Sequence, residues 1–469
     1  MRALILAAGL GSRFRSKKAK VLHTIMNKPM VWYVYQTIKE LNVKDIGVVV
    51  GHQAEEVKKI FEGEDNLLFF TQKNPKGGTA DAVISAIDFW RDYQGYLLVI
   101  NGDNPLVKSQ TIKNMQRYIH LVEEYENIKL SALILSSFFP DPTGYGRVVK
   151  DSQGNVIKIV EEKDASFEEK QIKEINGGVY LFYSPHLLNV IFSVKPSPVS
   201  GELYLTEVIN LMSQRGFVVR SFMAEEQAEV MGVNNRWELA IAENVIRLRI
   251  IEKLAKEGNT IHQPETVWIE PSVVLEGDVE IEPGVAIMGN SRLGKGVRVG
   301  RGSIIQNSIL EEGVIVEPYS VVKDSYIKSG AVVGPFAHVR NQSVVGERSH
   351  VGNFVEVKAS NIGNQVNAKH LAYIGDATIG DRTNVGAGVV FANYDGKKKY
   401  QSYVGENVFI GSNSLIIAPI QIGSYSYIAG GSVINKNIEG GALAIARAKL
   451  KVLKDKGKEK LTQSEPGGI

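Results

Sequence analysis

The chain has 469 residues, of which 44% are hydrophobic and 22% charged, and its formal net charge is only +3. This composition excludes a disordered chain, and the charge gives no reason to expect a nucleic acid or a membrane surface as partner. The length exceeds what one hydrophobic core normally organises, so we expect two domains. The absence of cysteine excludes disulfides and thiolate chemistry, and it fits a cytoplasmic location.

Apolar runs and amphipathic stretches alternate from residue 1 to about residue 231. The apolar runs predict buried parallel strands, and the stretches between them predict helices. This alternation indicates a Rossmann-like α/β sheet that is covered by helices and binds ligands at the carboxyl ends of its strands. The start of the chain is interpreted as a strand and not as a signal peptide. The predicted strands are 3–8, 46–50, 96–100 and 130–135, and the predicted helices are 30–41, 80–93 and 111–125.

The first predicted strand ends in a glycine-rich turn, Leu6-Ala-Ala-Gly-Leu-Gly-Ser-Arg13. Its glycines, Gly9 and Gly11, allow the backbone to approach a phosphate closely. Arg13 and Lys20 add fixed positive charge, which suits a triphosphate. The third glycine of a dinucleotide fingerprint and the Gly-Lys-Ser/Thr of a P-loop are absent, so the turn predicts a phosphate loop of another kind. The alternative is a tight strand-to-helix turn with surface cations.

The strand predicted at 96–100 leads into Asn101-Gly-Asp103. Asp103 is therefore expected at the edge of the sheet, where Gly102 leaves room beside it. A carboxylate in this position suits Mg²⁺ that bridges phosphate oxygens. The alternative is that Asp103 only caps the next turn. The glycine-rich turn and Asp103 together favour the metal interpretation.

A helix is predicted over 235–256, where apolar residues recur at i, i+4, i+8, i+11 and i+14. Asn235 is placed to cap its start, and Gly258 and Asn259 are placed to end it. We expect this helix to connect the two domains, and the alternative is a helix packed wholly on the first domain. The predicted apolar stripe consists of Trp237, Ile241, Val245, Leu248 and Ile251.

The C-terminal half repeats aliphatic residues at a spacing of six, beside recurring glycines. A helix needs a period near 3.6 and an exposed strand a period of 2, so neither explains the spacing. A period of six predicts a hexapeptide β-helix, in which each short strand forms one wall of a coil and stacking buries one aliphatic side chain per wall. Two unbroken series are Ile281, Ile287, Leu293, Val299, Ile305 and Ile410, Ile416, Ile422, Ile428, Ile434.

Two interruptions of the repeat are predicted, at 359–362 and at 392–403. Interruptions in a solenoid form loops, and loops carry function. The second contains the polar run Asn393-Tyr-Asp-Gly-Lys-Lys-Lys399, so it is the first place to expect a site. The alternative is that the whole solenoid is a spacer or an assembly module. Against that alternative stand polar residues within the coils: Lys358, His370, Tyr373, Asn384 and Tyr394.

Several motifs of the first half together resemble sugar-1-phosphate nucleotidyltransferases. With Lys369-His-Leu-Ala-Tyr-Ile-Gly-Asp376 in the second half, their order is similar to that of the bacterial bifunctional N-acetylglucosamine-1-phosphate uridyltransferase/glucosamine-1-phosphate acetyltransferase family, from residue 1 to about residue 447. One departure is Ala80-Asp81, where many members have Gly or Ala followed by His. Besides the glycine-rich turn and Gly102-Asp103, the motifs are Lys20-Val-Leu, Gly78-Thr-Ala-Asp-Ala, Thr143-Gly-Tyr-Gly-Arg147, Val160-Glu-Glu-Lys-Asp, Glu174-Ile-Asn-Gly-Gly and Gly232-Val-Asn-Asn-Arg236.

The resemblance implies Mg²⁺-dependent uridylyl transfer from UTP to N-acetylglucosamine-1-phosphate, by in-line attack on the α-phosphorus. It implies that Arg13 and Lys20 bind the triphosphate and stabilise the leaving pyrophosphate. The metal ligands implied are Asp103 and Asn234. Adjacent Glu161 and Glu162 point to opposite faces of a strand, so at most one is expected to reach the sugar. The implied uridyl contacts are Leu6, Ala8, Gly9, Gln72, Gly78 and Thr79, and the implied sugar contacts are Gly146, Glu161 and Asn176.

The resemblance also implies acetylation of glucosamine-1-phosphate by acetyl-CoA, which would supply the substrate of the first reaction. His370 is implied as the general base, since an imidazole pKa of about 6.5 allows proton uptake near neutral pH. A left-handed β-helix and a homotrimer with sites between subunits are implied as well. The residues implied for glucosamine-1-phosphate are Arg340, Lys358, Tyr373, Asn384 and Lys399, and those for acetyl-CoA are Asn393, Tyr394, Ser412, Gly430 and Arg447.

The expected organisation has four parts: a nucleotidyltransferase domain at 1–232, a linker helix at 233–259, a β-helix acetyltransferase domain at 260–447 and a polar, lysine-rich tail at 448–469. The substrates expected are small molecules, without nucleic acid or membrane. The alternative function is a nucleotidyltransferase with one activity, in which the β-helix serves only as a trimerisation scaffold. The presence of both His370 and the 392–403 loop favours two activities, because a scaffold needs neither.

Overall fold

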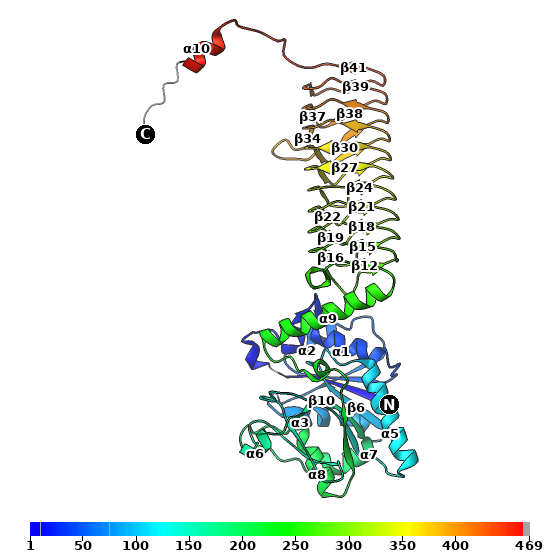
Figure 1. The fold of residues 1–469 in the computed structure, drawn as a ribbon, viewed down its shortest axis with the longest axis vertical. Coiled ribbons are helices and arrows are strands. Elements are labelled where there is room, and N and C mark those ends of the chain that lie inside the picture. The colour runs from blue at the N-terminus through cyan, green and yellow to red at the C-terminus, as the bar shows by residue number, and fades with distance from the viewer. Residues whose placement is uncertain (10, 75, 463–469) are drawn as a thin grey trace. The chain divides into compact units, whose positions relative to one another are not determined.

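The computed structural model describes residues 1–9, 11–74 and 76–462, which belong to two compact units, Met1–Arg247 and Leu248–Ile469 (Figure 1). Leu10 of the predicted phosphate loop, Pro75 before Gly78 and residues 463–469 of the predicted tail lie outside the described residues. In the part of the chain that is described, no helix combines the length and the apolar character needed to cross a bilayer.

The first unit is built on a nine-stranded sheet with the central order β11-β7-β10-β6-β1-β4-β5, to which β8 and β9 attach. The predicted strands form, and β4 and β6 pair with β1 in parallel. All four predicted strands point the same way, because β10, which the prediction did not include, runs antiparallel to both β6 and β7. Since β10 is buried along nearly its whole length, its composition resembles that of a parallel strand and gives no sign of direction. The strands are β1 (Arg2–Ala7), β2 (Thr24–Ile25), β3 (Lys28–Pro29), β4 (Ile46–Val50), β5 (Leu67–Thr71), β6 (Tyr96–Asn101), β7 (Ala132–Phe138), β8 (Arg147–Lys150), β9 (Val156–Val160), β10 (Glu174–Tyr183) and β11 (Val219–Met223).

Alternating side chains of β1 enter two different hydrophobic clusters. Ala3 and Ile5 belong to one cluster, and Leu4 and Leu6 belong to the other. Both faces of the sheet are therefore covered, which explains why the strands are continuous apolar runs. The predicted helix at 80–93 is interrupted at Ala86, which leaves helical geometry. The helices are α1 (Met30–Lys39), α2 (Ala54–Lys59), α3 (Gly78–Ser85), α4 (Ile87–Trp90), α5 (Ser109–Tyr125), α6 (Phe167–Lys170), α7 (Ser184–Ile191) and α8 (Thr206–Gln214), with short 3₁₀ turns η1 (Ser12–Phe14), η2 (Lys20–Leu22) and η3 (Gln227–Val230).

The predicted linker helix is α9 (Arg236–Lys256), and its predicted ends are confirmed. The Asn235 side chain accepts from the backbone amides of residues 237 and 238 at 2.9 Å, and Gly258 adopts a φ of +95°. The predicted apolar stripe is wrong for its first members, since Trp237 is 74% exposed and Ile241 and Leu248 are also exposed. Its last member, Ile251, is buried as predicted. It belongs to the apolar set that tertiary packing buries: Ala242, Ile246, Ile251 and Leu254.

The second unit is a parallel β-helix with three walls (Figure 1). Ile281, Ile287 and Leu293 lie on three successive walls and are fully buried, and Val299 begins the next coil. The six-residue period is thus confirmed, with one buried aliphatic side chain per wall. Buried serines stabilise the turns: the amide of Ser308 donates to the Ser291 hydroxyl at 3.3 Å, and similar bonds recur in later coils.

Each wall is a sheet whose strands come from successive coils. The first wall comprises β12 (Thr260–Ile261), β15 (Glu280–Ile281), β18 (Arg298–Val299), β21 (Ile315–Val316), β24 (Val332–Val333), β27 (His350–Asn353), β30 (Asn367–His370), β33 (Asn384–Val385), β36 (Phe409–Ile410), β39 (Tyr427–Ile428) and β41 (Leu443–Ala444). The second wall comprises β13 (Trp268–Ile269), β16 (Ala286–Met288), β19 (Ile304–Gln306), β22 (Val321–Lys323), β25 (His338–Arg340), β28 (Glu356–Lys358), β31 (Tyr373–Gly375), β34 (Val390–Ala392), β37 (Leu415–Ile417) and β40 (Val433–Ile434). The third wall comprises β14 (Val274–Leu275), β17 (Arg292–Leu293), β20 (Ile309–Leu310), β23 (Tyr326–Ile327), β26 (Val344–Val345), β29 (Asn361–Ile362), β32 (Ala377–Ile379), β35 (Ser402–Val404) and β38 (Ile420–Ile422). A short 3₁₀ turn, η4 (Pro264–Thr266), precedes β13, the first strand of the second wall. The helix α10 (Lys456–Thr462) lies near the C-terminus.

The two predicted interruptions have different outcomes. The first, at 359–362, is wrong, because this segment contains β29, and Ile362 pairs with Val345 in regular register. The coil from Val345 to Ile362 has 17 residues, one fewer than three repeats of six, so it looks like an interruption when the sequence is divided strictly into sixes. The second is confirmed: residues 393–401 project from the coil between β34 and β35, and Tyr394 forms a bridge with Lys399 (Figure 1).

Candidate active sites in the two units

The glycine-rich turn after β1 brings Lys20 close to the backbone. Gly11 has a φ of +65°, and a Cβ on it would lie 2.6 Å from the Cβ of Lys20. Only glycine fits both the left-handed backbone and the close approach. The turn therefore fixes the stem of Lys20, the cation predicted to bind phosphates.

Four predicted residues from distant segments meet at the carboxyl end of the sheet. The amide oxygen of Asn234 accepts from Arg13 Nη2 at 2.7 Å and from Lys20 Nζ at 2.8 Å. Lys20 Nζ also forms an ion pair with Asp103, whose backbone carbonyl accepts from the amide of Val233. The Lys20 and Asp103 side chains are largely buried. Two oxygens from separate segments, on Asp103 and Asn234, thus already surround one cation.

A cavity of about 260 Å³ adjoins this cluster. It is lined by Arg13, Asp103 and Asn234 at one end, and all three residues predicted to contact the sugar line it as well. Asn176 is held by Tyr180, to whose hydroxyl its amide donates at 2.7 Å. The predicted residues in the lining are Arg13, Thr79, Asp103, Gly146, Glu161, Asn176 and Asn234.

Of the adjacent pair Glu161 and Glu162, one faces the cavity, as predicted. Glu161 accepts from the Thr206 hydroxyl at 2.9 Å, and desolvation raises the pKa of its carboxyl. Both residues follow the end of β9, and Glu162 pairs with the buried Arg147 at 2.6 Å. Tyr204 and Thr206 also line the cavity, and sequence reasoning missed them because no motif there indicates a ligand.

The base-binding residues predicted from the sequence cluster near the end of β1. Leu6, Ala8 and Gln72 are buried there, and the hydroxyl of Thr79 accepts from the amide of Leu205 at 2.8 Å. Gln72 Nε2 donates to the carbonyl of Gly78 at 2.9 Å and to Asp81 Oδ2 at 2.8 Å. Both partners are acceptors, so the amide nitrogen must face them and Oε1 must face the opposite way. The departure noted at Asp81 thus has a structural role.

In the β-helix, the predicted general base and two predicted acetyl-CoA residues occupy one corner of successive coils. This first corner joins the first wall to the second wall. Asn353 pairs with His370 in register, and backbone bonds connect the corners above: Gly388 N to His370 O, Asn413 N to Ala387 O, and Gly431 N to Ser412 O. Arg447 Nη1 donates to the carbonyl of Gly430 at 3.1 Å. The first-corner residues are Asn353, His370, Ala387, Ser412 and Gly430, and those above His370 are small.

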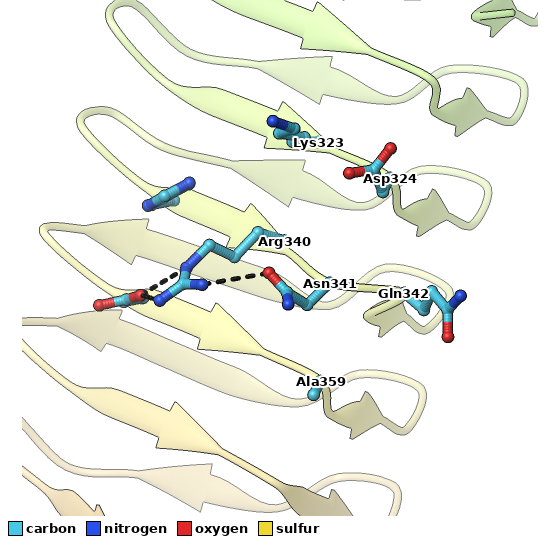
Figure 2. A pocket seen from close by; sticks show the side chains of 8 residues that line it. Lys323, Asp324, Arg340, Asn341, Gln342 and Ala359 are labelled. Atoms are coloured by element: carbon cyan, nitrogen blue, oxygen red, sulfur yellow. Dashed lines mark hydrogen bonds and ion pairs between the residues drawn. The ribbon is translucent and has the colours of Figure 1, made fainter.

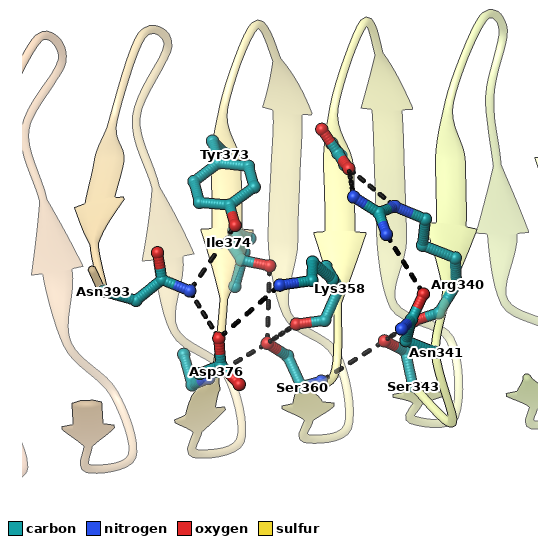
Figure 3. Close-up of polar contacts among 11 residues, drawn as sticks. Arg340, Asn341, Ser343, Lys358, Ser360, Tyr373, Ile374, Asp376 and Asn393 are labelled. Atoms are coloured by element: carbon teal, nitrogen blue, oxygen red, sulfur yellow. Dashed lines mark hydrogen bonds and ion pairs between the residues drawn. The ribbon is translucent and has the colours of Figure 1, made fainter. Parts of the chain in front are cut away.

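The second wall carries the predicted cations for the sugar phosphate. Arg340 and Lys358 pair in register on β25 and β28. Arg340 is held by Glu356, with Nη2 2.7 Å from the carboxylate, and by the side-chain oxygen of Asn341 at 3.1 Å (Figures 2 and 3). A cavity of about 980 Å³ here is also lined by Lys323 and His338, which sequence reasoning missed. In this part of the β-helix a coil is 17 or 18 residues long, so one coil back from Arg340 is Lys323 and one coil back from Glu356 is His338.

Tyr373, Asn393 and Lys399 lie close to Lys358. Asn393 Nδ2 donates to the Tyr373 hydroxyl at 3.4 Å (Figure 3). Contact with the Lys358 ammonium lowers the pKa of Lys399. Asn384, by contrast, lies on β33 of the first wall, away from the wall that carries Lys358 and Tyr373. Tyr394 is exposed, and its hydroxyl donates to the carbonyl of Gly396.

Comparison with known proteins finds matches to both units of the chain. A family model described as nucleotidyl transferase matches residues 2–238, one described as GMPPB C-terminal domain matches residues 269–362, and one described as bacterial transferase hexapeptide (six repeats) matches residues 401–436. The "Bifunctional protein GlmU" of Aquifex aeolicus (strain VF5) is 59% identical over 462 residues, which cover 98% of this chain and 99% of that protein. The chain belongs to the GlmU family. The GlmU of Hydrogenobaculum sp. (strain Y04AAS1) is 58% identical over 98% of this chain and 100% of its own length, and that of Acetivibrio thermocellus is 40% identical over 97% and 96%.

As a GlmU, the chain is a bifunctional N-acetylglucosamine-1-phosphate uridyltransferase and glucosamine-1-phosphate acetyltransferase of UDP-N-acetylglucosamine synthesis. UTP and acetyl-CoA are its donor substrates. The predicted function is thereby confirmed, and the alternative of a nucleotidyltransferase with a purely structural β-helix is set aside. The fold class, an α/β nucleotidyltransferase unit followed by a β-helix of hexapeptide repeats, is confirmed as well.

Proposed function

We propose that residues 1–232 perform uridylyl transfer with the residues gathered at the end of the sheet. An oxygen of the sugar phosphate forms a bond to the α-phosphorus of UTP, the bond from that phosphorus to the β-phosphate oxygen breaks, and pyrophosphate leaves. Arg13 and Lys20 neutralise the charge of the leaving group, and the cavity with Gly146, Glu161 and Asn176 holds the sugar. The convergence of Arg13, Lys20, Asp103 and Asn234 on one point beside this cavity supports the assignment.

Asp103 and Asn234 fit Mg²⁺ in this proposal. Within the described residues no cluster of three or more acidic, histidine or cysteine side chains provides a metal cage. Mg²⁺ at phosphate-transfer sites is normally held by one or two protein oxygens together with water and phosphate, so a carboxylate and an amide oxygen suffice. These two oxygens already hold the Lys20 ammonium between them. A bound metal would supply charge neutralisation at the phosphates, and Lys20 would then be available to the triphosphate.

For the second unit, we infer that residues 260–447 perform acetyl transfer at the first corner. His370 takes a proton from the amine of glucosamine-1-phosphate as that nitrogen bonds to the acetyl carbon. The carbon–sulfur bond then breaks, and His370 gives the proton to the leaving thiolate, so that CoA departs as a thiol. Arg340, Lys358 and Lys399 hold the sugar phosphate, and Tyr373 and Asn384 complete that site. Ala387, Ser412 and Gly430 leave a shallow path above His370 for acetyl-CoA, with Asn393, Tyr394 and Arg447 beside it. Residues 233–259 are the linker and 448–469 the tail.

A homotrimer formed through the β-helix is the assembly we propose. The rings of Tyr319, Phe336 and Phe354 stack with centroids 5.4 and 5.1 Å apart, and all three side chains are about half exposed (52, 46 and 56%). Such a column of exposed aromatic side chains favours a protein partner. Residues predicted for one acceptor site also occupy two walls, Asn384 on the first and Lys358 on the second, so a second copy is a natural source of the missing half. Phe336→Asp is expected to yield monomers in light-scattering chromatography and to lose acetyl transfer only.

The division of labour is tested by two single variants assayed for both reactions. Asp103→Ala is expected to lower uridylyl transfer at least 10³-fold at any Mg²⁺ concentration and to leave acetyl transfer within twofold. His370→Ala is expected to lower acetyl transfer by about 10²–10⁴-fold, the usual contribution of general base catalysis, with uridylyl transfer unchanged. Loss of both activities in a folded variant with native assembly would contradict the assignment of separate sites.

A further inference from the structure

Asp376 lies beside Lys358 and Asn393, which the proposed function assigns to the acetyl-transfer site, although no catalytic or binding role of its own follows from the sequence motifs. It follows β31, and its side chain is only 15% exposed. Its Oδ2 accepts a hydrogen bond from Asn393 Nδ2, and the same oxygen lies 3.9 Å from Lys358 Nζ, whose side chain is also buried (Figure 3). One carboxylate thus contacts two residues that the proposed function assigns to different substrates.

The backbone at Asp376 does not require a carboxylate. Asp376 forms the second corner of its coil, between the second and third walls, with a φ of +49°. The same one-residue corner is occupied in other coils by Asn307, Asp324 and Ala359, with φ values of +46°, +47° and +48°. Asp324, Ala359 and Asp376 also donate the same backbone bond, to the carbonyl of the residue that precedes the corner one coil earlier. Since Asn and Ala serve equally well, the acid at residue 376 is available for another role.

The first effect of the carboxylate is electrostatic. Lys358 and Lys399 are close enough for the Lys358 ammonium to lower the pKa of Lys399. Asp376 supplies the compensating negative charge beside Lys358. Without it, the repulsion between the two ammonium groups would have no neighbouring negative charge beside Lys358, whose side chain is only 12% exposed.

The second effect concerns the orientation of the Asn393 amide. Because an ionised carboxylate only accepts hydrogen bonds, the nitrogen of Asn393 must face Asp376, and Oδ1 must point away from it, as Figure 3 shows. Gly375 leaves the room for this arrangement, since a Cβ there would lie 2.4 Å from the Tyr373 hydroxyl and 2.7 Å from Asn393 Nδ2. Asn393 therefore presents an acceptor, and not a donor, to the substrates.

We propose that Asp376 is a positioning residue of the acetyl-transfer site, which holds Lys358 for the sugar phosphate and fixes Asn393 so that its Oδ1 accepts an N–H of the attacking amine. That hydrogen bond orients the amine, whose lone pair attacks the acetyl carbon while the proton that is lost goes to His370. The proposal rests on the proposed function of this site. It assigns to Asp376 an effect on the attacking geometry and only a small effect on phosphate affinity, because the positive charges of Arg340, Lys358 and Lys399 all remain.

Asp376→Asn tests the proposal with little change of shape. Asparagine is tolerated at this corner, as Asn307 shows, but its NH₂ group donates and permits the Asn393 amide to turn over. We expect kcat of acetyl transfer to fall about 30-fold or more, with KM for glucosamine-1-phosphate within threefold and uridylyl transfer unchanged. The control is Asp278→Asn, an exposed corner acid with a φ of +54° in the first coils of the β-helix; it is expected to retain both activities.

If Asp376 had only a structural role, Asp376→Asn would lower kcat and thermal stability together. Asp376→Ala would then also disturb the assembly of the protein. Alanine itself fits this corner, as Ala359 shows. If Asp376→Asn retains kcat within threefold, or raises KM for the sugar phosphate while kcat is unchanged, the proposal is wrong. His370→Ala, measured in the same assays, distinguishes an error in the proposed site from an error in the role of Asp376. If that variant keeps full acetyl transfer, the assigned site itself is wrong; if it loses activity while Asp376→Asn does not, only the role of Asp376 is rejected.

Discussion

The two active sites of this GlmU are assembled in opposite ways. In the first unit, Arg13 and Asn234 are 221 residues apart and meet because separate strands end at the same edge of the sheet. In the second unit, His370, Ser412 and Gly430 meet because they occupy the same corner of different coils. A sheet collects residues through its topology, whereas a solenoid collects them through its period. Changes in the first unit therefore affect unrelated segments, and changes in the second propagate to the coils above and below.

One device is common to both sites despite this difference. An aspartate fixes the orientation of an amide side chain by accepting from its nitrogen: Asp81 for Gln72 and Asp376 for Asn393. In each case the amide oxygen is turned away from the aspartate and is free to act as an acceptor. Neither aspartate belongs to the residues predicted to touch substrate. Both act on the residues that are predicted to do so, by fixing the orientation of their side chains.

The largest effect is expected from removing the Lys20 ammonium, which belongs to the first site only. Lys20→Met is expected to lower uridylyl transfer by about 10²–10³-fold, the usual cost of losing one group that stabilises transition-state charge. Because Lys20 occupies the space between Asp103 and Asn234, the variant should also bind Mn²⁺ about tenfold more tightly without nucleotide, measured by calorimetry. Acetyl transfer is the internal control. Unchanged or weaker Mn²⁺ binding would show that Lys20 does not compete for the metal ligands.

Two glycines sharpen the comparison at the level of packing. In Gly11→Ala the alanine would have to adopt the left-handed backbone of the turn, and its Cβ would lie 2.6 Å from the Cβ of Lys20. Uridylyl transfer should therefore fall about 10²-fold. Gly375→Ala meets the ends of the Tyr373 and Asn393 side chains, which can move, so acetyl transfer should fall only about tenfold. Gly457→Ala, with no atom within 4 Å, is the control. Equal losses in both reactions from either variant would indicate general destabilisation.

Base selection in the first site should depend on Asp81. If Gln72 Oε1 accepts N3–H of uracil, cytosine is disfavoured because its N3 carries no hydrogen. Asp81→Asn allows the Gln72 amide to turn over, so the ratio of kcat/KM for UTP to that for CTP should fall about tenfold, close to the loss of one hydrogen bond to a charged group. Asp88→Asn, a surface acid on α4, is the control. An unchanged ratio would mean that the carbonyl of Gly78 alone fixes Gln72.

The smallest expected effect is on stability and depends on pH. Desolvation raises the pKa of Glu161, so the folded protein retains a proton that the unfolded chain releases above its ordinary pKa of about 4.3. Stability is therefore lost as pH rises through the interval between these two pKa values. Glu161→Gln removes this loss and should raise Tm by about 2–4 °C at pH 8, the shift expected for about 1 kcal/mol in a unit of this size, with a smaller gain at pH 5.

Replacement of the neighbouring Glu162 should change Tm, measured by calorimetry, in the opposite direction. Desolvation is the largest single influence on the pKa of Glu162, but the hydrogen bonds from Arg147 and the Gly144 amide and the nearby positive charges together outweigh it, so the pKa is lowered. Its contribution to stability is therefore lost as pH falls through the lowered pKa. Glu162→Gln leaves Arg147 without its ion-pair partner and should lower Tm at pH 8. If both variants move Tm in the same direction, the surroundings of Glu161 and Glu162 do not differ as described.

The sequence by itself determined the local features whose physical cause lies within a few residues. The six-residue period identified the β-helix, because one buried side chain per wall repeats along the chain. The glycines at the end of β1 and the cap at Asn235 were predictable for the same reason, since a left-handed φ and a capping bond are local requirements. The motif order also identified the residues that converge at the first site.

Only the tertiary structure decided the features that depend on distant neighbours. The antiparallel direction of β10, the buried face of α9 and the regular coil at Ile362 depend on which strands or faces pack together, and composition is the same for either choice. Asp81 and Asp376 acquire their roles only through the amides that they contact. A carboxylate has the same chemistry in a turn and in a site, and only its three-dimensional surroundings distinguish the two.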